Sequence, residues 1–270
     1  MEFTELERQR VEKLERLRAQ GVEPYPPRVK RTHTIAEAIA ALEAVETAGE
    51  EGPRVTVAGR LRSMRVMGKV TFAHIEDGGG SIQLFLRIND VGEEAYDMFT
   101  RDFDLGDFVG AEGALMRTRT GEISVRVGQV RMLAKAISPL PVIKEKEVDG
   151  RRVRYTVFSD VEERYRQRYA DLACNPDVRE VFRVRARATK ALRRFLDGHG
   201  FLEVETPVLQ PVYGGAAARP FATYHHQLHQ ELFLHISDEL YLKRLLVGMY
   251  DRVYEIGHDF RNEGVSQKHN

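Results

Sequence analysis

The first fifty residues carry apolar side chains at the three- and four-residue spacing of amphipathic helices. The first such set is Phe3, Leu6, Val11, Leu14 and Leu17. Thr4 and Glu7 have the spacing of a capping box before that helix, and Thr34 and Glu37 repeat the spacing before a second apolar segment. We therefore expect residues 1–50 to form an N-terminal helical arm.

From Val55 to about Ala136 the period of the pattern shortens to two, which predicts β-strands. Five runs alternate in this way: VTVAGRLRSMRV, KVTFAHIED, SIQLFLRIN, DFVGAEGALMRT and EISVRVGQVRMLA. A helical segment, GEEAYDMFTRDF, follows the third run. Five strands with a helix between the third and the fourth have the order of an OB-fold β-barrel, although another small barrel fits the pattern equally. We assign residues 51–143 to this barrel and the charged, proline-containing residues 144–176 to a linker.

Residues 177–270 alternate between helical and extended patterns and predict an α+β domain. Asn175 and Pro176 stand at the N-cap and first position of a long helix that ends near Gly198. Its expected buried stripe is Val181, Val184, Ala188, Leu192 and Phe195. The predicted strands are FLEVETPVL, RPFATYHH, ELFLHIS and RVYEIGHDF, with a helix DELYLKRLLVGMY before the last.

Composition excludes several classes of protein. Hydrophobic residues make up 42% and charged residues 30% of the chain, and no run is apolar enough to span a bilayer. The N-terminus is too polar for a signal peptide, and the single Cys174 gives no disulfide framework, so the cytoplasm is the expected compartment. Because 41 basic residues balance 41 acidic ones, any binding of nucleic acid must depend on local clusters.

The candidate for nucleotide chemistry is an arginine, since the chain has neither a Walker A loop nor a Rossmann glycine fingerprint. The planar, permanently charged guanidinium of Arg261 suits a triphosphate, although a surface ion pair with Glu263 explains it equally well. The small residues of YGGAAARPF, residues 213–221, fit either close approach of the backbone to a ligand or a plain flexible loop.

Two further groups invite a functional interpretation. His225, His226 and His229 could suggest a metal site, but they have no fixed carboxylate or cysteine partner, so the sequence assigns no metal ligand. In the barrel, Phe72 and Gln83 could serve as a stacking platform and a base-edge reader, although an aromatic residue on a strand is more often part of the core.

Several segments together resemble the class II lysyl-tRNA synthetases. They are VMGKVTFAHIEDGGGSIQLF, DLGDFVGAEGALMRTRTGEIS, RYRQRYADL, FLEVETPVLQPVYGGAAARPF and ELYLKRLLVGMYDRVYEIGHDFRNEGVSQKHN. The likeness runs from the first helix to the last residue. The run GGAAARPF separates the lysine enzymes from the related aspartate and asparagine enzymes.

This resemblance implies an OB-fold that binds the anticodon, followed by a class II catalytic domain built on an antiparallel sheet with flanking helices. Phe72 would stack on an anticodon base, and Gln83 and Glu122 would hydrogen-bond the uridine-rich anticodon of tRNA(Lys). Residues 178–209 match the first class motif, which builds the dimer interface. The implied partners are tRNA(Lys), ATP, L-lysine and a second copy of the chain, with no membrane.

The resemblance also assigns catalytic roles. Gly215 and Glu239 match positions that receive lysine, with Glu239 as the partner of its α-ammonium group. Arg261 and Glu263 fall on the second class motif, where the arginine binds the ATP α-phosphate and the substrate carboxylate and the glutamate helps to hold adenine. Two residues match the tip of that motif, near the phosphates: His269 and Asn270.

The chain also departs from the family pattern. The carboxylates that hold Mg²⁺ and a third motif are expected in a missing C-terminal part, so we expect an incomplete catalytic domain, truncated within the second class motif and inactive alone. His235, His258 and Met64 stand where the family commonly has basic residues. The alternative function is a non-catalytic OB-fold module that binds RNA, whereas aspartate or asparagine specificity is disfavoured by the GGAAARPF run.

Overall fold

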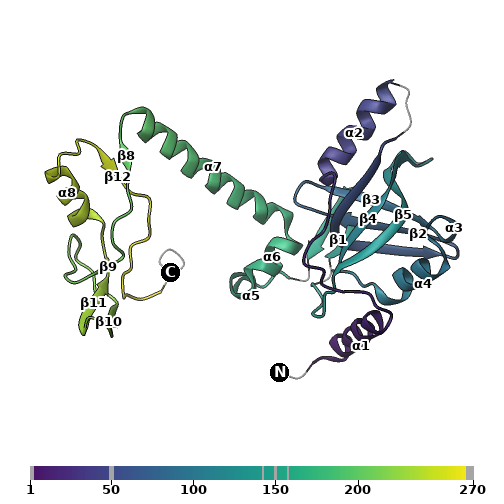
Figure 1. Cartoon of the computed structure of the whole chain (residues 1–270), viewed down its shortest axis with the longest axis horizontal. Coiled ribbons are helices and arrows are strands. Elements are labelled where there is room, and N and C mark those ends of the chain that lie inside the picture. Colours follow the sequence, from purple (N-terminus) through teal and green to yellow (C-terminus); the bar gives the residue numbers. More distant parts are fainter. Residues whose placement is uncertain (1–2, 49–51, 142, 149–150, 157, 266–270) are drawn as a thin grey trace. The chain divides into compact units, whose positions relative to one another are not determined.

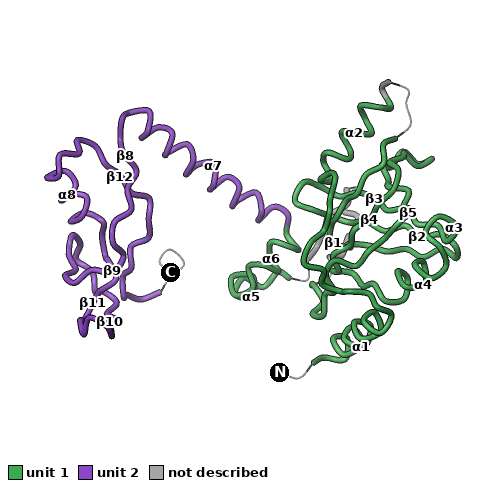
Figure 2. Tube along the Cα trace, viewed as in Figure 1, with its two compact units in different colours: residues 1–175 green, residues 176–270 purple. Residues whose placement is uncertain are grey.

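The chain divides into two units, residues 1–175 and 176–270, which are described separately (Figure 2). The computed structural model describes all residues except 1–2, 49–51, 142, 149–150, 157 and 266–270 (Figure 1). Among the described residues, no helix combines the length and the apolar character needed to cross a membrane.

Unit 1 begins with the two predicted helices, α1 (Glu5–Ala19) and α2 (Ile35–Ala48). At the start of α1, the Glu7 N–H donates to Thr4 Oγ1 over 3.3 Å, and the Thr4 N–H donates to Glu7 Oε2 over 2.9 Å. Thr34 and Glu37 make the same pair of contacts at the start of α2. Both capping boxes are therefore confirmed.

A closed five-stranded barrel forms the centre of unit 1. The strands follow one another around it in the order β1-β2-β3-β5-β4. They are β1 (Arg54–Met67), β2 (Val70–Glu76), β3 (Ser81–Arg87), β4 (Phe108–Arg117) and β5 (Ile123–Ala134). The helices α3 (Ile88–Val91) and α4 (Glu93–Asp102) connect β3 to β4. This is the predicted OB-fold order, and the barrel closes through the parallel pair β3–β5.

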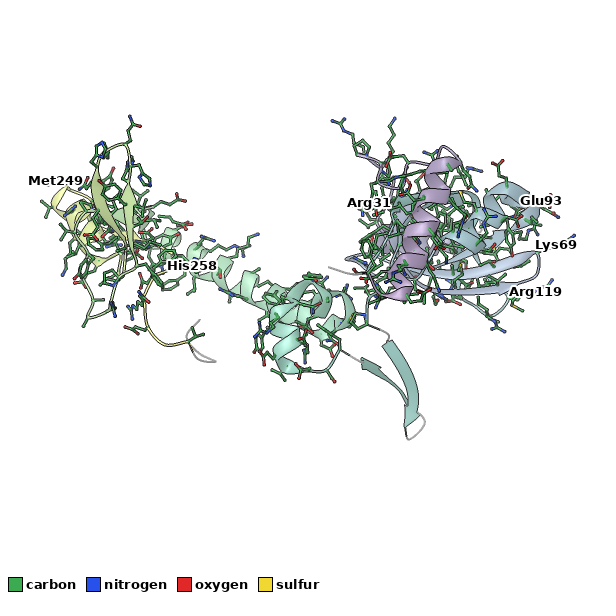
Figure 3. The ribbon with its side chains drawn as sticks, turned by 90° about the horizontal axis from the view of Figure 1, so that it is seen from below. Arg31, Lys69, Glu93, Arg119, Met249 and His258 are labelled. Carbon is green, nitrogen blue, oxygen red and sulfur yellow. The ribbon has the colours of Figure 1, made fainter. Side chains whose placement is uncertain are left out.

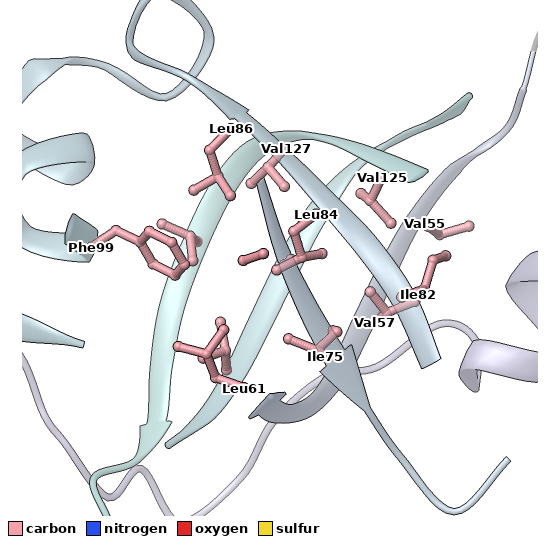
Figure 4. Packing of buried hydrophobic residues seen from close by; sticks show 14 of the residues in the cluster. Val55, Val57, Leu61, Ile75, Ile82, Leu84, Leu86, Phe99, Val125 and Val127 are labelled. Carbon is pink, nitrogen blue, oxygen red and sulfur yellow. The ribbon is translucent and has the colours of Figure 1, made fainter. Parts of the chain in front are cut away.

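The core of unit 1 lies inside this barrel (Figure 4). Alternate residues of the strands point inward, among them Val57, Leu84 and Val125, and Phe99 closes the core from α4. Because successive strand residues face opposite sides, the same alternation directs every second residue of β2 and β3 outward.

The segment predicted as a linker contains regular structure. Strands β6 (Ile143–Val148) and β7 (Arg151–Thr156) pair antiparallel. The short helices α5 (Val161–Arg166) and α6 (Arg168–Cys174) follow. The buried Asp171 carboxylate connects these helices, since it accepts hydrogen bonds from Arg164 over 2.8 Å and from Asn175 over 2.6 Å.

Unit 2 consists of two helices and five short strands within its described residues. The helices are α7 (Pro176–Gly198) and α8 (Glu239–Val247). The strands are β8 (Leu202–Glu203), β9 (Leu209–Gln210), β10 (Ala222–His225), β11 (Gln230–Leu234) and β12 (Val253–Tyr254). β10, β11 and β9 form an antiparallel sheet, and β12 pairs with β8 in parallel. The strand predicted over FLEVETPVL is therefore split between two sheets, and Pro207, which has no N–H to donate, lies between its two parts.

The stripe predicted to be buried on α7 is exposed. Val181, Val184, Leu192 and Phe195 are between 50% and 65% exposed, and no residue of α7 is buried. The prediction of a buried stripe was wrong because no other described element of unit 2 covers this face of the helix.

Candidate functional site

The outer face of β2 and β3 carries the residues predicted to bind an anticodon. Phe72 lies opposite Phe85 across the two strands, and their ring centroids are 5.2 Å apart. His74 lies opposite Gln83 in the same register. Since Ala73 points into the barrel core, Phe72 and His74 share the outward face. The pair Phe72–Phe85 and the pair His74–Gln83 are therefore successive pairs along the same outward face of the two strands.

A hydrogen-bond network fixes the orientation of the Gln83 carboxamide. Its Nε2 donates to Glu122 Oε2 over 2.6 Å, and its Oε1 accepts from Ser124 Oγ over 2.8 Å. His74 Nε2 lies 2.6 Å from the other carboxylate oxygen of Glu122, and His74 Nδ1 lies 2.9 Å from Ser63 Oγ. The structure therefore brings Gln83 and Glu122 into direct contact. Ser124 restrains the far side of Gln83, and His74 restrains the far side of Glu122.

The sequence interpretation missed His74 and Phe85. Their signal is the two-residue period of β2 and β3, which places them on the face of Phe72 and Gln83 once the register is known. Met64 packs against the barrel core, and Arg65 is the residue of β1 that lies opposite Phe72. Arg65 is exposed, and Arg126 of β5 lies opposite Phe85, so a basic residue stands in register beside each ring of the aromatic pair.

In unit 2, Gly215 lies against the start of α8. Its φ is +85°, and a Cβ at this position would lie 3.0 Å from Ser237 Oγ and 3.2 Å from Glu239 Cβ. The Glu239 carboxylate forms an ion pair with Lys243, one turn along α8. The structure therefore brings the two predicted lysine-binding residues together. The ammonium group of Lys243 is the present partner of the Glu239 carboxylate.

Arg261 is held by the segment between β11 and α8. Its Nε donates to the Ile236 carbonyl oxygen over 3.4 Å, and its Nη2 lies 3.6 Å from Asp259 Oδ2. The backbone around it is fixed, because the Phe260 N–H donates to the His235 carbonyl over 3.0 Å. Its side chain remains 48% exposed, which leaves guanidinium N–H groups available to a ligand.

The remaining predicted nucleotide residues are less constrained. Glu263 is exposed, and its backbone N–H donates to the Arg261 carbonyl over 3.0 Å. Among the described residues, however, the carboxylate that pairs with Arg261 is that of Asp259, not that of Glu263. His269 and Asn270 lie outside the described residues.

The two histidines that depart from the family pattern contact each other. His235 is buried, and its Nε2 donates to the His258 carbonyl oxygen over 3.0 Å, while the His258 side chain is exposed at the surface of unit 2 (Figure 3). Asp238 lies beside His235, and burial together with the charge of Glu255 raises the pKa of the Asp238 carboxyl. The loop histidines His225, His226 and His229 are all exposed.

Comparison with known proteins identifies two regions of the chain. Residues 160–270 match the family model "tRNA synthetases class II (D, K and N)", and residues 55–133 match the model "OB-fold nucleic acid binding domain". Residues 160–270 therefore belong to the class II tRNA synthetase family. Curated relatives named lysine–tRNA ligase match all of this chain: that of Roseiflexus castenholzii is 54% identical, that of Chloroflexus aurantiacus 52% and that of Pelotomaculum thermopropionicum 50%.

The chain spans about half the length of the curated relatives it matches: 53%, 52% and 50% of these three. The two family models correspond to its two candidate sites. The OB-fold region carries the Phe72–Gln83–Glu122 face, and the class II segment carries Gly215, Glu239 and Arg261. The family resemblance and the OB-fold expectation are thereby confirmed.

Proposed function

We propose that this chain carries the anticodon-binding domain and the first part of the catalytic domain of a cytoplasmic lysine–tRNA ligase. The observation that carries the proposal is the hydrogen-bonded Gln83–Glu122 pair beside Phe72, in a chain at least 50% identical along its whole length to three lysine–tRNA ligases. Its substrates are ATP, L-lysine and tRNA(Lys).

Anticodon recognition combines stacking with hydrogen bonding on the barrel face. Phe72 offers its ring to an unstacked base, and Phe85 supports that ring from the neighbouring strand. The Gln83 carboxamide and the Glu122 carboxylate present donor and acceptor atoms to the edge of a uridine, with orientations set by Ser124 and His74. Lys69 and Arg119 lie exposed on unit 1 and add cationic charge that attracts phosphates, whereas Arg31 is already paired with Asp77 over 3.8 Å (Figure 3).

Lysine activation takes place in unit 2. The α-ammonium group of lysine replaces Lys243 at the Glu239 carboxylate, and the absence of a Cβ at Gly215 keeps space beside it. The lysine carboxylate attacks the α-phosphate of ATP, and pyrophosphate leaves to give lysyl-adenylate. The terminal ribose hydroxyl of the tRNA then attacks the lysyl carbonyl, and AMP leaves. ATP enters as its Mg²⁺ complex, and we assign the residues of this chain to the nucleotide alone.

Arg261 is the residue that faces the nucleotide. Its guanidinium binds the α-phosphate and the substrate carboxylate, and it neutralises charge that develops at phosphorus. The Ile236 carbonyl accepts from Nε, and Nη2 lies 3.6 Å from Asp259 Oδ2, so binding of a phosphate by the terminal nitrogens competes with Asp259. Glu263, with His269 and Asn270, contributes contacts to adenine and the phosphates.

The exposed apolar stripe of α7 supports the proposal of a homodimer. Val181, Val184, Leu192 and Phe195 lie in the segment that resembles the first class motif, and all four are at least half exposed. A helix whose apolar face stays in water is expected to be covered in an assembly.

Binding of tRNA tests the proposed function. The full chain is titrated against labelled tRNA(Lys) and against the same tRNA with its anticodon replaced, at low and at moderate salt. We expect tighter binding of the native anticodon and a loss of affinity for both as salt rises. Equal affinity for the two RNAs at every salt concentration would refute anticodon recognition.

A second candidate function is a non-catalytic RNA-binding module. The barrel favours it, because the large apolar core cluster lies in unit 1, whereas Ile236 and Tyr254 are the buried hydrophobic residues of unit 2 within its described part. Ligand-dependent stability separates the two functions. A ligase site is stabilised by L-lysine but not by L-aspartate, while an RNA-binding module responds to neither.

A further inference from the structure

A buried histidine in unit 2 directs an unpaired ring nitrogen at a carboxylate. His235 is 2% exposed, and its Nε2 faces the His258 carbonyl oxygen. A carbonyl only accepts hydrogen bonds, so Nε2 carries a proton and donates it. In the neutral ring, Nδ1 is then left with a lone pair. Nδ1 lies 3.1 Å from Asp238 Oδ1, yet neither atom has a hydrogen-bond partner of suitable geometry in the described part of the chain.

Asp238 does not perform the role that its position predicts. It is the N-cap residue of α8, where an aspartate side chain normally accepts a hydrogen bond from the first turn of the helix. Here the carboxylate makes no such bond and faces His235 instead. Two atoms with lone pairs therefore lie close together in a buried place, which is unfavourable unless a positive charge lies between them.

Further carboxylates surround the same place. Ligand atoms of His235, Asp238 and Asp259 all lie within 4.8 Å of one another. Glu255 Oε2 is buried without a hydrogen-bond partner among the described residues, and both Glu255 and Asp238 approach Gly257 within about 4 Å of the position of its missing Cβ. The cluster thus gathers three acids around one imidazole lone pair.

We propose that His235, Asp238 and Asp259 bind a divalent transition-metal ion such as Zn²⁺. A metal-binding histidine almost always donates its other ring N–H to a carboxylate, a carbonyl or water, which is the arrangement of His235 with His258. Two ligands of a tetrahedral zinc ion lie about 3.4 Å apart, close to the separation of Nδ1 and Oδ1. One imidazole with carboxylates suits zinc, iron or manganese better than magnesium, which prefers oxygen ligands alone.

The site adjoins the proposed nucleotide site. Asp259 Oδ2 lies 3.6 Å from Arg261 Nη2, so an ion bound to Asp259 reduces the attraction of this carboxylate for the guanidinium. Arg261 is then more available to a phosphate. This consequence rests on the proposed function, whereas the metal site itself does not.

Metal binding to the full chain tests the proposal. The exposed histidines His225, His226 and His229 are first replaced by glutamine, so that they cannot contribute a surface site. The chain is treated with chelator, dialysed and titrated with Co²⁺, whose visible absorption reports nitrogen and oxygen coordination, and Zn²⁺ is added in competition. We expect one ion per chain and displacement of Co²⁺ by Zn²⁺.

Single substitutions then locate the ligands. Asp238→Asn and His235→Gln are each expected to weaken metal binding by at least about tenfold, because outer-shell changes alone already cost that much. Asp251→Asn changes an exposed acid elsewhere in unit 2 and is expected to leave binding unchanged. Circular dichroism monitors folding. If His235→Gln unfolds the chain, Asp259→Asn, at an exposed position, provides the decisive measurement.

Three results would overturn the proposal. One is the absence of a tightly bound ion in the chain without its loop histidines. Another is unchanged metal affinity in folded Asp238→Asn and Asp259→Asn variants. A doubly protonated His235 seen by nitrogen NMR in metal-saturated protein would also refute it, because Nδ1 would then hold a proton instead of a metal. None of these measurements depends on binding of RNA or lysine.

Discussion

Replacement of Glu122 by alanine tests the proposed recognition of an anticodon by the barrel face. The Glu122 carboxylate accepts two short hydrogen bonds, each of 2.6 Å, from Gln83 and from His74. The side chain is 45% exposed, so its loss is expected to change the free energy of unfolding by less than about 1 kcal/mol. In the RNA complex, however, the variant loses one acceptor and the restraint on the Gln83 carboxamide.

The expected penalty on binding follows from these contacts. A well-placed pair of hydrogen bonds to a base edge contributes about 1–3 kcal/mol of discrimination. This corresponds to a roughly 5- to 150-fold loss of affinity for an anticodon stem-loop. The loss is expected for the lysine anticodon and to be much smaller for a stem-loop whose central uridine is replaced. The assay is fluorescence anisotropy of the two labelled stem-loops with the full chain.

Glu122→Gln is the matched control. Its amide oxygen can accept from Gln83, while its NH₂ group donates to His74 Nε2 if the histidine takes the other tautomer. The orientation of Gln83 is then preserved, and the variant should retain most of its discrimination between the two stem-loops. If Glu122→Ala stays folded and discriminates as well as the unchanged chain, the network does not determine specificity.

Three further outcomes are expected. Phe72→Ala should weaken binding of both stem-loops by about 1–3 kcal/mol, since stacking is largely independent of sequence; equal affinity in a folded variant removes Phe72 from the site. Gly215→Ala should lower the stability of unit 2 by about 1–3 kcal/mol in urea, because φ is +85° and Ser237 is close, whereas Gly264→Ala, in open space, should not. Hydrogen bonds from Arg126 and Arg87 hold the pKa of Asp90 well below its usual range. Asp90→Asn should therefore lower the free energy of unfolding by about 1–3 kcal/mol at neutral pH. This difference in stability should shrink as the pH falls through about 4 and below, where the unfolded-state carboxyl is protonated. A difference that is constant from pH 7 to about 2 would contradict this role of Asp90.

Local signals predicted much of unit 1. The capping boxes at Thr4 and Thr34 and the two-residue period of the strands depend only on neighbours in the sequence, and the structure confirms them. The position of a helix between the third and fourth strands matches the OB-fold order, but the pattern alone fitted another small barrel equally, and the strand pairing of the structure decides between them. These features could be predicted because each requires contacts over only a few residues.

The details of the sites required contacts between distant residues. The participation of His74 depends on its register opposite Gln83 and on Glu122, which lies 48 residues away. A shift of one residue would turn His74 toward the core, and β1 does contain a register irregularity between Leu61 and Ser63. The contact of His235 with the His258 carbonyl depends likewise on how two segments of unit 2 meet. Period and composition contain no information about such pairings.

The exposure of the apolar stripe on α7 was likewise not predictable from the period of the sequence. The free energy gained by covering this stripe constrains the proposed dimer. Complete burial of a valine, leucine or phenylalanine side chain contributes about 1.5–3 kcal/mol. Val181, Val184, Leu192 and Phe195 are only 50–65% exposed, so covering all four contributes on the order of 3–8 kcal/mol. Association costs an estimated 4–15 kcal/mol. The stripe alone is therefore marginal, and a stable dimer must also cover the exposed apolar residues that follow α7, which include Leu202. The interface should accordingly extend through residues 178–209 rather than end with the helix.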